Sequence, residues 1–224
     1  MEKDVLVNAV TPHRILLLVI LLALSLDNAY ADNAEGMPVE CQTDCVSPYG
    51  KVLGTSKRGV EAYSNCQSDC VIYEPNHWKG TYTGIKWQCV EYARRWLLIN
   101  KGAIYGDVDI AADIWNNIDY LTEVATNRVI PIESYLNGSK QPPQVGDLLI
   151  YAKAFNDTGH VAVVIDADYE NGVIEAGEQN YSNEPWPEDF SRKIELVRKG
   201  DNYWLLDGYL LGWKHAGNYK KERQ

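Results

Sequence analysis

The stretch GIKWQCVEYARRWLLINKG, from Gly84 to Gly102, contains the clearest helix signal of the chain. From Val90 onward, apolar side chains recur with the 3.6-residue period of a helix, and Gly102 is a typical stop signal. We therefore predict a helix that begins at Gln88 or Cys89. The first turn of a helix has unpaired N–H groups and the positive end of the helix dipole, which favour a thiolate at Cys89. The alternative is an unreactive thiol packed in the core.

The beginning of the chain predicts export. The run ILLLVILLALSL (Ile15–Leu26) is too short to span a bilayer comfortably, and Ala29–Ala31 supplies small residues for cleavage. We predict a signal peptide over residues 1–31, and an uncleaved membrane anchor is the alternative. The cleaved protein would lie in the periplasm or outside the cell. No later stretch is apolar enough for stable membrane association.

The chain is acidic, with a formal net charge of −10. Loss of the leader would remove two positive and three negative charges and leave −9. Bulk electrostatics therefore exclude nucleic acid as a partner and favour a cationic ligand.

Four of the five cysteines form two similar motifs, CQTDC and CQSDC, whose members are Cys41, Cys45, Cys66 and Cys70. In an oxidising compartment they predict two disulfides that clamp the N-terminal arm, residues 32–48. Three pairings are possible. The nested pairing, Cys41–Cys70 with Cys45–Cys66, suits two antiparallel helical turns. A four-thiolate zinc site is the rival interpretation. In either case Cys89 remains unpaired, and because a free thiol is a liability after export, we favour a functional role.

A thiolate nucleophile needs a base, and His160 is the best placed histidine. Within Asp157–Ala167, a turn led by Gly159 leads into a predicted strand whose first residue is His160, and a further turn joins this strand to another over Val173–Asn180. Such a hairpin brings His160 opposite the end of the second strand. We predict that His77 lies in a loop and that His215 lies on the surface.

The residues opposite His160 are Glu178, Gln179 and Asn180. Strand alternation sends Glu178 and Asn180 to one face and Gln179 to the other. We predict that Glu178 orients the imidazole, as in a catalytic triad, and that Asn180 assists it or contacts substrate. The side chain of Gln88 and the backbone N–H of Cys89 are candidates for an oxyanion hole.

The segments KWQCVEYARR, DTGHVAVV and EQN, in this order, resemble the CHAP family, the cysteine, histidine-dependent amidohydrolases/peptidases. Within it the chain is most similar to the amidase domain of the glutathionylspermidine synthetase/amidases. The resemblance extends from Tyr49–Gly54 to Leu210–Trp213, about three quarters of the chain.

The resemblance implies an α+β, papain-like fold (CHAP or NlpC/P60 type). In this fold an N-terminal helix carries the cysteine and an antiparallel sheet carries the histidine. It implies that Cys89 attacks an amide carbonyl to form a thioester, that His160 moves the proton and that Glu178 orients His160. Gln88 matches the oxyanion donor, and no metal or other cofactor is required.

The resemblance also places Arg94 and Asn180 near the substrate. The alternative for Arg94 is a solvated helix face. The implied organisation is a signal peptide (1–31), an N-terminal arm (32–48), a CHAP amidase domain (49–215) and a C-terminal tail (216–224).

We therefore predict an exported cysteine amidase or peptidase that acts on a small peptide or on a polyamine amide similar to glutathionylspermidine. A peptidoglycan amidase or endopeptidase acting on muropeptides, in the form of a cell-wall hydrolase or antibacterial effector, is the alternative. A binding domain without activity is a third hypothesis, which the presence of Cys89, His160 and Glu178 disfavours.

Overall fold

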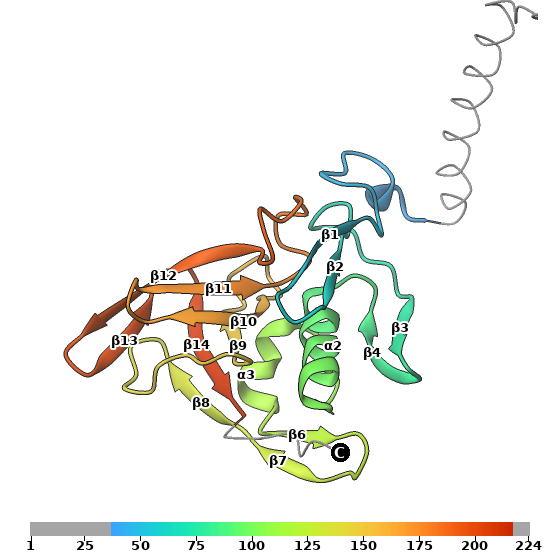
Figure 1. Cartoon of the computed structure of the whole chain (residues 1–224). Helices are drawn as coiled ribbons and strands as arrows, with labels where there is room; N and C mark the ends of the chain where they lie inside the picture. Colours follow the sequence, from blue (N-terminus) through green and yellow to red (C-terminus); the bar gives the residue numbers. More distant parts are fainter. Residues whose placement is uncertain (1–36, 217–224) are drawn as a thin grey trace, which may run out of the picture. The chain divides into compact units, whose positions relative to one another are not determined.

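The computed structural model describes residues 37–216 (Figure 1). The predicted signal peptide and all of the predicted tail beyond residue 216 lie outside the described residues, so the domain boundaries stay predictions. Within residues 37–216, no helix is both long and apolar enough to cross a membrane.

The largest element is a seven-stranded sheet in the order β13-β12-β11-β10-β9-β14-β8. All neighbouring strands are antiparallel, and they are β8 (Glu133–Leu136), β9 (Leu148–Tyr151), β10 (Val161–Asp168), β11 (Val173–Gly177), β12 (Arg192–Lys199), β13 (Asn202–Leu205) and β14 (Leu210–His215).

Three smaller sheets and short helices complete the described part. The sheets are β1 (Val52–Thr55) with β2 (Glu61–Tyr63), β3 (Pro75–Trp78) with β4 (Thr81–Ile85), and β5 (Ala103–Ile104) with β6 (Tyr120–Glu123) and β7 (Val129–Pro131). The helices besides α2 are η1 (Val39–Cys41), η2 (Ala111–Asp113) and α3 (Ile114–Asn117).

Helix α2 (Cys89–Lys101) is the helix predicted from the sequence. Gln88 is its N-cap, and it ends at Gly102, whose left-handed φ of 67° lets its N–H reach the carbonyl of Leu98. The helix packs against β4, β5 and β10. The predicted helix start and stop are both confirmed.

The central strand β10 is buried on both faces, and its side chains alternate between two apolar layers. Val161, Val163 and Ile165 belong to the layer that contains α2. Ala162 and Val164 belong to the opposite layer. Burial on both faces explains why this segment of the sequence reads as a continuous apolar run. The predicted α+β fold, with a helix on an antiparallel sheet, is confirmed.

The hairpin predicted around His160 is present. Strands β10 and β11 pair in the register Val163 opposite Gly177, and residues 169–172 form the turn between them. Both strands begin and end within a few residues of the predicted limits. Strand β11 ends at Gly177, three residues before the predicted end at Asn180.

The N-terminal arm has the nested pairing, with disulfides Cys41–Cys70 and Cys45–Cys66. The four cysteines are therefore not the ligands of a four-thiolate zinc site in this structure. The predicted reason for the pairing was only partly correct. Cys41 ends the 3-10 helix η1, but residues 66–70 form turns rather than a helix, and Cys66 has a left-handed φ of 67°.

Candidate active site

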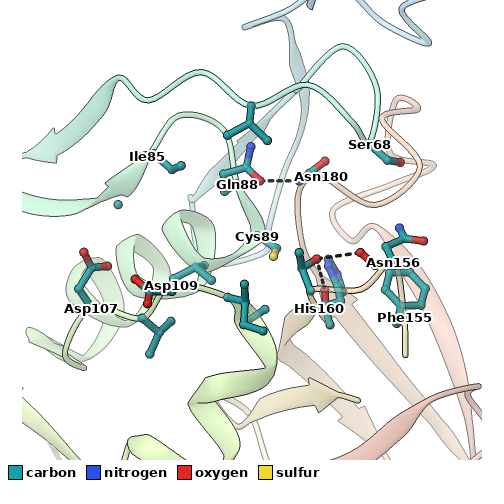
Figure 2. A pocket seen from close by; sticks show the side chains of 18 of the residues that line it. Ser68, Ile85, Gln88, Cys89, Asp107, Asp109, Phe155, Asn156, His160 and Asn180 are labelled. Atoms are coloured by element: carbon teal, nitrogen blue, oxygen red, sulfur yellow. Dashed lines mark hydrogen bonds between the residues drawn. The ribbon is translucent and has the colours of Figure 1, made fainter. Parts of the chain in front are cut away.

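Helix α2 places Cys89 in the wall of a pocket of about 620 Å³. Gln88 has an extended backbone, with φ −80° and ψ 157°, so Cys89 is the first residue of the helix. Its thiol takes part in no disulfide, and the residue is only 8% exposed. Figure 2 shows Cys89 and His160 next to each other in the pocket. The thiol thus meets the positive end of the helix dipole and a histidine in the same place.

His160 immediately precedes β10 and is buried. Its Nε2 lies 2.8 Å from Oε2 of Glu178, and its ring is close enough to Cys89 to lower the pKa of the thiol. Because Glu178 occupies Nε2, Nδ1 is the ring nitrogen left for the sulfur. The structure thus brings together the three predicted catalytic residues from the start of a helix, the start of one strand and the end of the next.

The three groups shift each other's pKa values. Burial by itself would raise the pKa of Cys89, but the charge and hydrogen bond of His160 outweigh it and lower the pKa of the thiol. Burial by itself would lower the pKa of His160, but its interactions with Cys89 and Glu178 raise it to about 9. Burial opposes ionisation of Glu178, yet the hydrogen bond to His160 and the charge of Arg192 lower its pKa to about 2. These shifts favour a thiolate at Cys89 and an imidazolium at His160 beside the carboxylate of Glu178.

The amide of Gln88, the residue before Cys89, is held by hydrogen bonds at both its nitrogen and its oxygen. Its Nε2 donates to the carbonyl of Cys70 at 3.2 Å and, at the long distance of 3.4 Å, to Oδ1 of Asn65. Its Oε1 accepts a 2.8 Å hydrogen bond from Nδ2 of Asn180, drawn in Figure 2. Both of these contacts of Nε2 thus lead to Cys70 and Asn65, so the role of the Gln88 amide as an oxyanion donor stays a prediction.

Asn180 corrects the prediction from strand alternation. It does not share a face with Glu178 but contacts Gln88 and Asn65. The reason is that β11 ends at Gly177 and Asn180 has a left-handed φ of 55°, so the period of two no longer applies. Asn180 nevertheless lines the pocket, as a substrate contact must.

Gln179, which the sequence analysis gave no role, connects the strand to the helix. Its Nε2 donates to the carbonyl of Gln88 at 3.0 Å and to the carboxylate of Glu91 at 2.8 Å. Glu91 is fully buried and pairs with the guanidinium of Arg95 at 2.7 Å. These bonds fix the distance between the segment that carries Glu178 and the first turn of α2. The Glu91–Arg95 ion pair could have been predicted from the sequence, because an acidic residue in the first turn of a helix is followed by an arginine four residues later.

Arg94 does not lie on a solvated helix face, so that alternative is wrong. It is 5% exposed, its guanidinium lies over the rings of Tyr82 and Tyr105, and it pairs with Asp107 at 2.8 Å. Arg94 itself does not line the pocket, whereas Asp107 does. A direct contact between Arg94 and substrate therefore stays a prediction.

The other two histidines of the predicted mature chain lie outside the pocket, and both predictions for them were wrong. His77 belongs to strand β3 rather than to a loop. His215 is in β14, and its Nδ1 contacts the buried carboxylate of Asp147 at 2.6 Å, so it is not a free surface residue.

Comparison with known proteins places the same region in a family. Residues 80–180 match the CHAP domain family. The chain is 34% identical to the bifunctional glutathionylspermidine synthetase/amidase of Escherichia coli (strain K12), covering 75% of this chain and 29% of the relative. It is 31% identical to the trypanothione synthetase of Crithidia fasciculata, covering 78% of this chain and 26% of the relative. The chain thus spans less than a third of the length of these relatives.

Proposed function

We propose, from the CHAP domain that residues 80–180 form, that this chain is a cysteine-dependent amidase or peptidase. The observation that carries the proposal is that Cys89 and His160 line one pocket and shift each other's pKa values, while His160 is bonded to the buried Glu178. A nucleophile, a base and a group that orients the base are what hydrolysis of an amide requires.

In the proposed mechanism, the Cys89 thiolate attacks the amide carbonyl, and the developing oxyanion is stabilised by the backbone N–H of Cys89 and an N–H of Gln88. His160 gives its proton to the leaving amine as the C–N bond breaks, which leaves a thioester. The imidazole then takes a proton from water, and the resulting hydroxide equivalent attacks the thioester and regenerates the thiolate. Glu178 keeps Nδ1 directed at the sulfur throughout.

We further propose a cationic amide as substrate, such as a conjugate between a peptide carboxyl and a polyamine. Three aspartates support this, because Asp69, Asp107 and Asp109 all line the pocket. Part of the charge of Asp107 is neutralised by Arg94, whereas Asp69 and Asp109 are both exposed toward solvent. The name of the E. coli relative, a glutathionylspermidine synthetase/amidase, points to the same substrate class.

The two disulfides favour a second candidate, because they fit an exported protein, and peptidoglycan is an amide-rich substrate outside the cell. Amidase or endopeptidase activity on muropeptides would use the same cysteine chemistry. The disulfides are also what supports the proposed export to the periplasm or the exterior of the cell.

The test is to incubate the chain with glutathionylspermidine and, separately, with muropeptides, and to identify the products by mass spectrometry. Cys89→Ala should abolish turnover and retain binding, because the substitution removes the nucleophile and little contact area. Hydrolysis by Cys89→Ala at the wild-type rate would contradict the assigned chemistry. Asp109→Asn should raise KM for the polyamine amide and leave KM for a neutral amide of the same acyl group unchanged. Equal effects on both amides would contradict the cationic subsite.

A further inference from the structure

Arg192, the first residue of β12, is bound to the site by every nitrogen of its guanidinium. Its Nε donates to Oε1 of Glu178 at 2.7 Å. One terminal nitrogen donates to Oδ2 of Asp207 at 2.6 Å, and the other donates to the hydroxyl of Tyr151 at 2.7 Å. Such a fully used fork has a single orientation, so Arg192 presents a fixed positive charge to Glu178.

The carboxylate of Glu178 is consequently held from two sides. Oε2 contacts His160, while Oε1 accepts from Arg192 and, at 3.1 Å, from the hydroxyl of Ser191. A carboxylate bound at only one oxygen could rotate about its last bond. Here rotation would break a hydrogen bond to a charged group, so Oε2 stays where the imidazole needs it.

The rings of Tyr181 and Tyr151 lie near both Arg192 and His160. The guanidinium of Arg192 lies 4.4 Å from the ring centroid of Tyr181 and 5.8 Å from that of Tyr151. The ring of His160 lies 5.3 Å and 5.5 Å from the same two rings. Arg192 thus helps to position the rings that pack around the imidazole, as well as its carboxylate partner.

We propose that Arg192 is a positioning residue for the reaction. It fixes Glu178 against His160, and its charge offsets part of the negative charge that Glu178 presents to the imidazole. This inference rests on the proposed function only in treating Cys89 and His160 as the reacting pair. The sign of the charge alternates from the imidazolium of His160 to the carboxylate of Glu178, the guanidinium of Arg192 and the carboxylate of Asp207.

The consequence is a pH dependence with a definite sign. Removal of the positive charge of Arg192 makes the imidazolium easier to form and the thiolate harder to form, so the pKa values of both His160 and Cys89 should rise. Removal of the negative charge of Asp207 should lower both. The tyrosines around these groups have pKa values raised by burial and stay neutral in the range of the test; they are Tyr92, Tyr105, Tyr151 and Tyr181.

The test is the rate of alkylation of Cys89 by iodoacetamide as a function of pH, which needs no substrate. In the wild-type chain the rate should rise once as the thiolate forms and again as the imidazolium loses its proton. In Arg192→Gln both inflections should lie about half a pH unit or more higher. Arg192→Lys retains the charge and should restore both inflections to near the wild-type values, although it lacks the fork. Arg198→Gln is the matched control, because Arg198 is an exposed residue of the same strand that donates to the carbonyl of Gly200.

Unchanged inflections in Arg192→Gln, with a loss of thermal stability only, would overturn the proposal and leave Arg192 a structural role. Equal shifts in Arg192→Gln and Arg192→Lys would overturn the role of the charge. If Arg192→Gln does not fold, Asp207→Asn supplies the test, since its inflections must move to lower pH. A wild-type chain without any fast alkylation of Cys89 below pH 8 would instead refute the proposed function, so the two failures are distinguishable.

Discussion

Removing the inner disulfide tests whether the N-terminal arm stabilises the fold by constraining the unfolded chain. The perturbation is the double variant Cys45→Ala/Cys66→Ala, which leaves the outer bridge Cys41–Cys70 intact. The outer bridge joins residues 29 apart in sequence and the inner bridge joins residues 21 apart.

The magnitude follows from the nesting. On the loop-closure entropy relation, a single bridge closing 29 residues stabilises by about 3.6 kcal/mol, and one closing 21 residues by about 3.3 kcal/mol. Once the outer bridge exists, however, the inner bridge closes only the eight residues by which the two separations differ. That smaller ring corresponds to about 2.5 kcal/mol. Removal of either bridge alone should therefore cost about 2.5 kcal/mol, and removal of both about 6 kcal/mol, more than the sum of the single losses.

The assay is urea-induced unfolding without reductant, followed by tryptophan fluorescence, for the inner, outer and combined variants. Wild-type protein treated with dithiothreitol should match the combined variant. A loss below about 1 kcal/mol for either single-bridge variant would refute the entropy argument. The outer variant should also lower kcat/KM more than the inner one, because the carbonyl of Cys70 holds the amide of Gln88 at 3.2 Å.

Three further predictions concern the charged groups of the site and the core. His160→Ala should slow alkylation of Cys89 at pH 7 by about tenfold or more, because the largest opposition to the effect of burial on the pKa of the thiol is then lost. An unchanged rate by mass spectrometry would contradict the ion pair. The kcat/KM of the wild-type enzyme should fall above about pH 9. The pKa of His160 is raised to about 9, and above it the imidazolium loses the proton that the leaving amine needs. A stopped-flow or discontinuous assay up to pH 10 checks this. Glu91→Gln should reduce the free energy of unfolding by about 3–5 kcal/mol, because the guanidinium of Arg95 is then buried without its counter-charge, and a loss below about 1 kcal/mol in urea unfolding would refute this account.

Glu178→Gln separates orientation from proton transfer. It should reduce kcat/KM less than His160→Ala does, since the amide can still contact the imidazole but no longer stabilises its charged form. A loss equal to that of His160→Ala, in a variant shown by circular dichroism to be folded, would contradict the orienting role.

The parts of the site that could be predicted from the sequence depend on signals within one helix or one hairpin. Helix α2 was predictable because its apolar 3.6-residue period and the stop signal at Gly102 act within a few residues. The β10–β11 hairpin was predictable because a four-residue turn joins its strands and brings His160 near Glu178, although the register shifts between Val164 and Asp166. The unpaired state of Cys89 followed from counting cysteines.

Only the tertiary structure decided which residues support this constellation. Arg192 reaches Glu178 because β12 pairs with β11 in the register Ala176 opposite Arg192, and no local pattern specifies that register. Arg94 is buried because Tyr82 in β4 and Tyr105, which follows β5, cover its guanidinium. In both cases the deciding contacts join different segments whose pairing no local signal specifies, and their geometry exists only after the sheets and the helix have packed together.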